Sequence, residues 1–295
     1  MNIISFGPLN IDHIYAVESF ARPGGAISCA KFEKAPGGKG LLLSVAIARA
    51  GSKIFCAGKI GSDGKIILDA LSENGVNTNL INPYGTYSGH AVIQVNKYGN
   101  RSVMIHGGAN LELARGEIDR LMNVFSVGDI LIIQDGISNI PYIIDSAYGK
   151  YIKIALNPSQ IGGGFEEIDL NKISYLIINK TDGEKITGES RPSRMMDCLL
   201  DKYRHMKVVL TLGQTGALYG DEMIRIQQAA YNVEAVDTEA AGETFLGYFI
   251  SGVSMGAPSW KALRMAARAA ALSVTMKGAL ASIPRREEVL GFIAA

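Results

Sequence analysis

The stretch Ala235-Val-Asp-Thr-Glu-Ala-Ala-Gly-Glu-Thr-Phe-Leu-Gly247 places three small residues and then a carboxylate at the predicted start of a helix. The first backbone N–H groups of a helix have no partner inside it, and this end carries a partial positive charge. Ala240, Ala241 and Gly242 have no side chain that would keep an anion away from these groups. The carboxylate of Glu243 follows where it can take a proton from a hydroxyl group. The alternative interpretation is an ordinary helix start, where acidic residues are common, and it explains the same residues.

The bulk composition describes a folded protein without a strong charge of either sign. The chain has 295 residues, of which 47% are hydrophobic and 19% charged, so it has ample material for a core. Lys and Arg number 29 against 28 Asp and Glu, a formal net charge of +1. A nearly neutral chain does not attract nucleic acid or anionic lipid as a whole, so we expect neither partner and any phosphate site to be local.

The cysteines and the N-terminus predict a cytoplasmic protein. The three cysteines, Cys29, Cys56 and Cys198, are odd in number and form no Cys-x-x-Cys pair. This pattern suits a reducing compartment better than a disulfide framework, and we interpret all three as packing residues. The chain begins with Asn2-Ile-Ile-Ser-Phe-Gly after the first Met, so we expect no signal peptide and no membrane span.

Short apolar runs alternate with helical patterns along most of the chain, which predicts an α/β core around a mostly parallel sheet. The runs expected to form buried strands are 3–6, 54–57, 130–133, 152–156, 175–178 and 208–212. Apolar residues at three- and four-residue spacing predict helices over 40–50, 65–74, 140–149, 192–203 and 259–276. No linker or repeat divides the chain, so we expect one domain over residues 1–295.

Two segments alternate apolar and polar residues like exposed antiparallel strands, and they cover about residues 12–35 and 91–105. Lys97-Tyr-Gly-Asn100 predicts a hairpin turn within the second segment. Together the segments predict a small sheet beside the core. Such a sheet would expose an apolar face, which suits a lid over a site, a dimer surface, or both.

Polar and glycine-rich residues near the N-terminus form a candidate ligand site. In Pro36-Gly-Gly-Lys-Gly40 the glycines let the backbone approach a ligand and the lysine supplies a charge. This motif is neither the phosphate loop of nucleoside triphosphatases nor a dinucleotide fingerprint. Asn10 and Asp12 follow the first strand, where an amide and a carboxylate suit sugar hydroxyls. Turn chemistry accounts equally well for both.

Two later strands are also followed by small and polar residues, Asn179-Lys-Thr-Asp182 and Thr211-Leu-Gly-Gln-Thr-Gly216. The carboxyl edge of the sheet is where α/β proteins bind ligands, although most strand ends bind nothing. The four histidines show neither metal-ligand spacing nor a Ser-His-Asp arrangement.

Taken together, the motifs resemble those of the ribokinase-like (PfkB) carbohydrate kinases, and within that family they are most similar to ribokinases. The motifs that carry the resemblance are Gly37-Gly-Lys-Gly, Asn157-Pro, Asn179-Lys-Thr-Asp, Thr211-Leu-Gly and Asp237-Thr-Glu-Ala-Ala-Gly-Glu-Thr-Phe. The resemblance implies a three-layer α/β/α fold with a small β-sheet lid that pairs two subunits. It also implies transfer of the γ-phosphoryl group of ATP to a sugar hydroxyl.

The resemblance assigns residues to each part of this site by position. The catalytic set is the base Glu243 with an anion hole of Ala240, Ala241 and Gly242. The acceptor set is Asn10, Asp12, Gly38, Lys39, Gly40, Leu42 and Asp135. The nucleotide set is Asn179, Thr211, Leu212, Gly213, Gly216 and Gly242. A monovalent cation, usually potassium, is implied at Asp237, Glu239, Ser273, Met276, Gly278 and Ser282, and Asp182 is implied to organise water around magnesium.

The sequence departs from the family at several of these positions. The family base is an aspartate, so Glu243 carries its carboxylate on a longer arm, and Asp182 stands where a glutamate is usual. Leu42 replaces an asparagine that contacts the sugar; Gly136 falls near a sugar-binding glutamate, for which Asp135 would serve after a one-residue shift. Ribose suits such a pocket poorly, and a bulkier acceptor, a nucleoside or a sugar phosphate stays open. A non-catalytic regulator that binds nucleotide or sugar is the alternative function.

Overall fold

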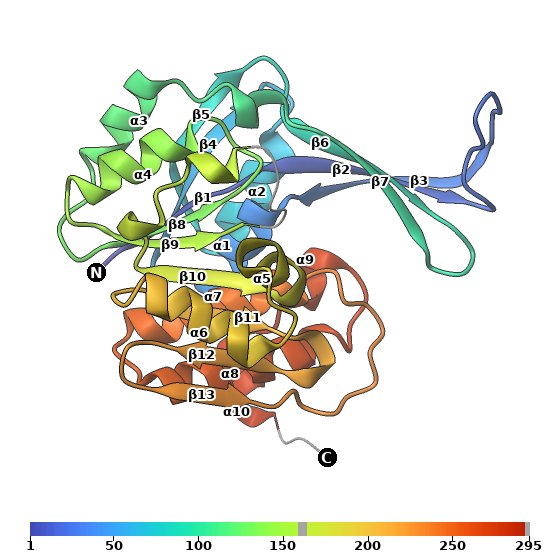
Figure 1. Cartoon of the computed structure of the whole chain (residues 1–295). Coiled ribbons are helices and arrows are strands. Elements are labelled where there is room, and N and C mark those ends of the chain that lie inside the picture. The colour runs from blue at the N-terminus through green and yellow to red at the C-terminus, as the bar shows by residue number, and fades with distance from the viewer. Residues whose placement is uncertain (159–163, 293–295) are drawn as a thin grey trace.

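The central element of the computed structural model, which describes residues 1–158 and 164–292, is a nine-stranded sheet (Figure 1). Its strand order is β13-β12-β11-β10-β9-β8-β1-β4-β5. All neighbours pair in parallel except at β12 and β13, which form an antiparallel edge. The strands are β1 Ile3–Phe6, β4 Ile54–Gly61, β5 Asn77–Gly85, β8 Ile130–Gln134, β9 Lys153–Asn157, β10 Tyr175–Asn179, β11 Lys207–Thr211, β12 Ala217–Gly220 and β13 Arg225–Gln228.

Helices cover both faces of this sheet and complete the expected three-layer α/β/α architecture. One layer contains α1 Lys39–Arg49, α2 Lys65–Glu73, α7 Ala241–Ser254, α8 Ser259–Ser273, α9 Ala279–Ser282 and α10 Arg286–Gly291. The opposite layer contains α3 Arg115–Met122, α4 Ile140–Tyr148, α5 Lys180–Thr187 and α6 Pro192–Lys202. The helix expected over 259–276 ends at Ser273, three residues before Met276.

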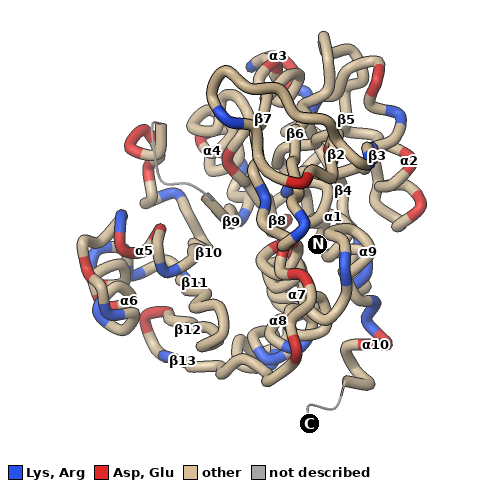
Figure 2. The backbone as a smooth tube through the Cα atoms, turned by 90° about the vertical axis from the view of Figure 1, so that its right-hand side faces the viewer, with Lys and Arg blue, Asp and Glu red and all other residues tan. Residues whose placement is uncertain are grey.

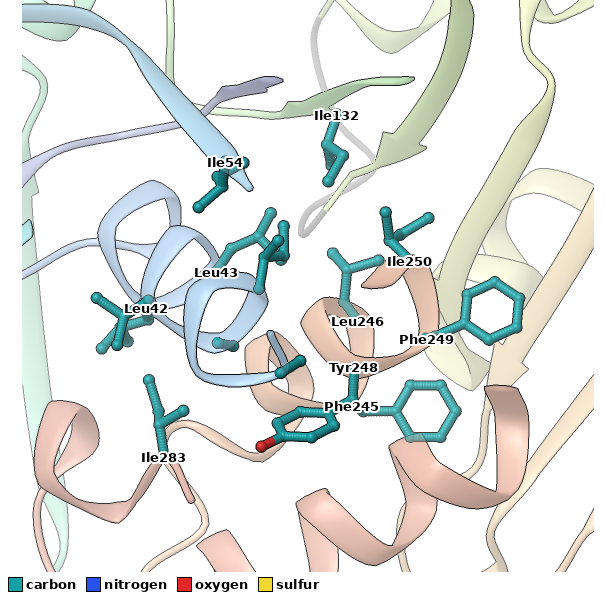
Figure 3. Close-up of a cluster of buried hydrophobic side chains, with 14 of the residues drawn as sticks. Leu42, Leu43, Ile54, Ile132, Phe245, Leu246, Tyr248, Phe249, Ile250 and Ile283 are labelled. Carbon is teal, nitrogen blue, oxygen red and sulfur yellow. The ribbon is translucent and has the colours of Figure 1, made fainter. Parts of the chain in front are cut away.

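Alternation along each buried strand divides the core into two hydrophobic clusters. In β1, Ile3 packs on the α7 side while Ile4 packs on the α4 side, because successive side chains of a strand point to opposite faces. Both faces of the parallel part of the sheet are covered, so its strands are rich in buried Ile, Val and Leu. Figure 3 shows the cluster on the α7 side of the sheet, to which Leu43 of α1 and Leu246 and Ile250 of α7 belong.

Helices α1 and α7 pack at a very short distance because small residues face each other. A Cβ atom on Gly247 would lie 2.5 Å from the Ala46 Cβ and 3.1 Å from the Ile47 nitrogen. The absence of a side chain at Gly247 therefore allows the contact. It brings the N-termini of the two helices to the same side of the molecule, where the candidate site lies.

A second, four-stranded sheet extends from the body of the molecule (Figure 1) and is called the small sheet below. It has the order β3-β2-β6-β7, with β2 Asn10–Val17, β3 Cys29–Gly37, β6 Gly89–Val95 and β7 Arg101–His106. Both segments expected to alternate as strands lie in it. The predicted hairpin turn joins β6 to β7, closed by a hydrogen bond from the Asn96 N–H to the Asn100 carbonyl.

The cysteine prediction is correct for only one of the three residues. Cys56 is fully buried and burial raises the pKa of its thiol to about 11, so it packs as an inert apolar residue. Cys29 and Cys198 are exposed and free. Cys29 begins β3 in the projecting small sheet and Cys198 lies on the outer side of α6, so neither position faces a core.

Charge and helix length give two further properties of the chain. Acidic and basic residues are interspersed along the backbone in Figure 2, in keeping with the formal net charge of +1. Within residues 1–158 and 164–292, no helix combines the length and apolar character needed to cross a membrane.

Candidate functional site

A cavity of about 620 Å³ lies where the small sheet meets the body of the molecule. Its walls come from the β1–β2 turn, the start of α1, the strands β6 and β7, and the segment that leads into α7. Seven of the expected site residues line it together: Asn10, Asp12, Gly38, Lys39, Leu42, Asp135 and Glu243. Asp237 and Glu239, expected at a cation site, line it as well.

The glycines of the Gly37-Gly-Lys-Gly motif are required by close contacts. Gly38 has φ +88°, and a Cβ atom there would lie 2.4 Å from the Pro8 carbonyl oxygen. The Gly40 N–H donates to the same oxygen over 3.0 Å, and a Cβ at Gly40 would lie 2.5 Å from the Gly7 carbonyl carbon. The motif thus fits the start of α1 against the β1–β2 turn. This placement leaves Lys39 between them at the cavity wall.

Asn10 and Asp12 are held at the floor of the cavity by specific neighbours. The Asn110 side chain donates to the Asn10 Oδ1 over 2.9 Å and accepts the Leu9 N–H at 2.9 Å. Asn110 is 4% exposed, so it fixes the orientation of the Asn10 amide from below. Asp12 lies over Gly37, where a Cβ atom would fall 1.9 Å from its Oδ2. Both side chains present oxygens suited to hydroxyl groups.

The start of α7 lies beside the cavity: Glu243 is in its lining, whereas the expected anion-hole residues Ala240, Ala241 and Gly242 are not. Ala240 is the N-cap residue and makes no side-chain cap, so the first N–H groups of the helix receive no side-chain acceptor from it. A Cβ atom at Gly242 would meet nothing within 4 Å, and Gly242 is exposed. Glu243, in the first turn, lines the cavity. An anion therefore has access to this helix end from solvent.

Burial raises two pKa values in the cavity, and an excess of carboxylates over cations adds to the shifts. Burial raises the pKa of Asp12 to about 6; the Glu239 carboxylate adds to the shift and the Arg101 guanidinium opposes it. Burial also raises the pKa of Glu243, to which Glu239 and Asp135 contribute while Lys39 opposes. Perturbed carboxyl groups inside a cavity are typical of acid–base sites.

Arg101 connects the small sheet to the segment before α7. From the first position of β7 its Nη2 lies 3.2 Å from the Asp237 Oδ2, and its Nη1 pairs with Glu239. Sequence reasoning did not single out Arg101. The alternation of Arg101, Val103 and Ile105 along one strand face contained the signal, because all three line the cavity. Asn110 was also missed, as its role depends on a contact across 100 residues.

The expected nucleotide residues other than Gly242, which lies in the first turn of α7, are at the carboxyl ends of neighbouring strands, and none of the set lines this cavity. Asn179 of β10 pairs in register with Thr211 of β11. Leu212 then leads into a short 3₁₀ helix, Gly213–Thr215, and its N–H donates to the Gly216 carbonyl over 2.8 Å. Gly216 has φ +106°, and a Cβ atom there would lie 2.0 Å from the Gln228 carbonyl oxygen, so the turn requires glycine.

Asp182 fits an indirect role toward magnesium. It is 2% exposed, and its Oδ2 accepts a hydrogen bond from the Asn179 Nδ2 over 2.6 Å. Its backbone N–H donates in turn to the Asn179 Oδ1, which caps α5. Magnesium prefers carboxylate and water oxygens and retains several waters. A contact through water suits this buried carboxylate better than direct coordination.

The residues expected to hold a monovalent cation fit their ion less well than Asp182 fits magnesium. Both Asp237 oxygens already accept N–H groups: Oδ2 from Arg101 and from Gly278 (3.1 Å), and Oδ1 from Glu239 (3.1 Å). The Ser273 and Gly278 carbonyls accept the N–H groups of Met276 and Ser282. The carboxylate that would hold the ion is therefore already neutralised by a guanidinium.

Comparisons with known proteins find one family along almost the whole chain. The model of the pfkB family carbohydrate kinases matches residues 1–286. The chain is 32% identical to the ribokinase of Haemophilus influenzae, over 97% of this chain and 96% of that protein. The crystal structure of the Thermotoga maritima ribokinase superposes with a TM-score of 0.88 at 29% identity, covering 98% of each chain. The Arabidopsis thaliana ribokinase, solved with ribose and ATP, gives 0.83 at 25% identity over 99% of each chain.

Proposed function

This chain belongs to the pfkB family of carbohydrate kinases, and from that premise we propose that it transfers the γ-phosphoryl group of ATP to a hydroxyl of a sugar or related small alcohol. Phosphoryl transfer requires the protein mainly to align two oxygens and to neutralise the negative charge that spreads over the phosphoryl group. The proposal therefore assigns residues to four tasks: binding the acceptor, accepting its proton, facing the phosphoryl group, and binding the nucleotide.

The acceptor site is the cavity. Asn10 and Asp12 hold hydroxyl groups of the acceptor, and Asn110 keeps the Asn10 amide oriented. Glu243 takes the proton of the attacking hydroxyl, and its raised pKa brings it closer to the working range of a general base. Lys39 stabilises the carboxylate form of Glu243 and lies close to the incoming negative charge.

The phosphoryl group lies against the start of α7. The backbone N–H groups at the start of α7, from Ala240, Ala241 and Gly242, stabilise the charge that develops on the phosphoryl oxygens. The Ala241 N–H, which donates to the Thr238 carbonyl over 3.3 Å in this structure, exchanges that partner for a phosphoryl oxygen. ATP extends from there to the residues that end β10 and β11, Asn179 and Thr211–Gly216. Magnesium, bound with ATP and oriented through water by Asp182, supplies further neutralisation of the phosphates.

One observation carries this proposal. Asn10 and Asp12 from the first strands and Glu243 from the last third of the chain line the same cavity, next to a helix end that is open to an anion. An acceptor bound there has its hydroxyl beside a base and beside the phosphoryl site.

The cavity favours an acceptor larger or less polar than ribose. Leu42, Ile93, Val103, Ile105 and Leu111 add an apolar surface to the lining, and on the small sheet Ile105 lies in one row with Asp12 through Ala91. A free pentose would leave part of about 620 Å³ unfilled and would present hydroxyl groups to this surface. A nucleoside, or a sugar with an apolar substituent, covers both the polar and the apolar lining.

Assembly and location complete the proposal. The pocket side of the small sheet exposes Val103 at 52% and Ile105 at 67%, an apolar surface that a second copy of the chain would cover in a homodimer. The proposal of a cytoplasmic location rests on the cysteine pattern. Potassium, expected from the resemblance, is left out because its donor set fits poorly.

The test is ADP formation with ATP, magnesium and a panel of sugars, sugar phosphates and nucleosides. We expect turnover with at least one acceptor, and a Glu243→Gln variant that keeps ATP binding but loses about 10²- to 10⁴-fold in kcat. Gln has nearly the shape of Glu and cannot accept the proton. A Glu243→Gln variant as active as the wild type would show that Glu243 is not the base.

The second candidate is the non-catalytic regulator, favoured by the longer arm of Glu243 in place of the family aspartate. A carboxylate displaced by roughly 1 Å can cost about a hundredfold in rate. Binding and turnover separate the two candidates. Thermal stabilisation by ATP or an acceptor without ADP formation from any member of the panel would favour the regulator.

A further inference from the structure

One ion-pair cluster joins the small sheet to the catalytic helix. The Arg101 guanidinium on β7 contacts both Asp237 and Glu239, which stand immediately before the small residues that begin α7. The arginine is 34% exposed and the Asp237 carboxylate 14% exposed, so water screens this pair only in part. Asp237 in turn accepts the Gly278 N–H at 3.1 Å. The Asp237 carboxylate, in the segment that leads into α7, thus contacts both the small sheet and the loop before α9.

The charge balance of the cavity depends on this arginine. Five carboxylates line the cavity, from Asp12, Asp135, Asp237, Glu239 and Glu243, against the two cations of Lys39 and Arg101. Without the guanidinium, the Asp12, Asp237 and Glu239 carboxylates would face one another with no cation among them. Their mutual repulsion would displace the segment that positions the start of α7.

We propose that Arg101 is a positioning residue that takes over the charge balance the family leaves to a monovalent cation, so that the enzyme works without potassium. Both carboxylate oxygens of Asp237, a charged group expected at the ion, already accept N–H groups, and a guanidinium held by two carboxylates is a fixed internal cation. Because Arg101 belongs to the small sheet, its ion pairs form only when that sheet lies against the cavity. Closure of the sheet and order at the phosphoryl site are therefore coupled.

The kinetic test rests on the proposed function and compares potassium, sodium and tetramethylammonium chloride at equal ionic strength. We expect wild-type rates that agree within about twofold in the three salts, since a cation held in the fold needs no ion from solution. Arg101→Ala should lose about tenfold to a hundredfold in kcat, with the KM for ATP little changed, because the helix start is misplaced. Millimolar guanidinium chloride should restore part of that rate, and Arg101→Lys should keep part of it.

Lys97→Ala is the matched control, because Lys97 lies on the same hairpin and pairs with Glu18 while 56% exposed. It should behave as the wild type in every salt. A wild-type rate that rises tenfold or more with potassium would overturn the inference. So would an Arg101→Ala variant that keeps the full rate in all three salts.

Hydrogen exchange tests the same inference without any turnover. In Arg101→Ala, and not in Lys97→Ala, amide exchange should accelerate over residues 101–106 and 236–242, because the sheet and the α7 segment lose their link. Unchanged exchange there would overturn the inference even if the protein proved to have no kinase activity. Faster exchange in a chain without kinase activity would uphold the link and refute only the proposed function.

Discussion

At the scale of single residues, the site depends on side chains whose charge is set by their neighbours. Asp12 and Glu243 are acidic groups that the cavity shifts toward their protonated forms, while Lys39 and Arg101 oppose the shift. An acceptor that donates hydrogen bonds requires the carboxylate form of Asp12. Its affinity should therefore weaken as pH falls through about 6.

The raised pKa of Asp12 also predicts a pH-dependent stability. Because its pKa is about 6 in the folded chain and 3.8 in the reference state, the folded state binds more protons between these values. The contribution of Asp12 to the free energy of unfolding is then greatest at low pH. It falls by up to about 3 kcal/mol as the pH rises through the range between the two pKa values. Urea denaturation of the wild type and of Asp12→Asn at pH 4 and pH 7 measures the difference.

Asn at position 12 cannot ionise, so the Asp12→Asn variant should gain stability relative to the wild type on going from pH 4 to pH 7. A constant difference between the two proteins across this range would show that Asp12 titrates normally. The pKa of Glu243 is raised as well, but Glu243 is present in both proteins, so its contribution to the stability cancels in the comparison.

At the scale of elements, close backbone contacts decide where the site residues lie. The start of α1 approaches the β1–β2 turn so closely that only glycine fits at Gly38 and Gly40. The same applies to α7, which approaches α1 at Gly247. These contacts fix the N-termini of two helices beside one cavity.

Gly40→Ala tests the contact between α1 and the turn. The added Cβ atom would lie 2.5 Å from backbone atoms of Gly7, which cannot rotate away. We expect a loss of about 2 to 3 kcal/mol in the free energy of unfolding, within the usual range for an overpacked site. Chemical denaturation measures it.

Gly116→Ala is the control for this substitution. Gly116 lies in the first turn of α3, and a Cβ atom there meets nothing within 4 Å. Its replacement should leave stability unchanged or raise it by less than about 1 kcal/mol, since Ala restricts the unfolded chain. Equal losses at both positions would argue against the close contact at Gly40.

At the scale of the whole molecule, the small sheet has two unlike faces. On the pocket side Ile14 pairs with Ile93, which in turn pairs with Val103. On the other side His13 lies between His90 and Phe32, with ring centroids 5.9 Å and 5.8 Å away, and this face also exposes apolar side chains at Phe32 and Met104. An apolar face on a projecting sheet is the surface that a second copy of the chain is expected to cover.

Sedimentation velocity tests the proposed homodimer. We expect a species of twice 31.5 kDa for the wild type and a shift toward the single chain for Ile14→Glu, which places a charge on the apolar face outside the cavity lining. Met104→Glu is the control, since Met104 is 67% exposed but lies on the opposite face. A wild-type monomer, or dissociation by Met104→Glu alone, would contradict this interface.

Much of the fold could be predicted because each signal is local. A buried parallel strand such as Ile130–Gln134 begins with four consecutive apolar residues, and the hairpin turn at Lys97-Tyr-Gly-Asn100 is encoded by adjacent residues. The strands β12 and β13 at the antiparallel edge were not predicted. Both are only four residues long; β12 is largely buried but ends in Gly220, and β13 is partly exposed, so neither contains a run long enough to indicate a strand.

The sequence by itself determined the α/β class, the order of the motifs and the helix start before Glu243, because these depend on neighbours along the chain. Only the tertiary structure decided that Arg101 meets Asp237, that Asn110 orients Asn10, and that Cys29 and Cys198 face solvent. Contacts between residues a hundred or more positions apart follow from how strands and helices pack. No local pattern of residue types specifies which charged or polar groups that packing brings together.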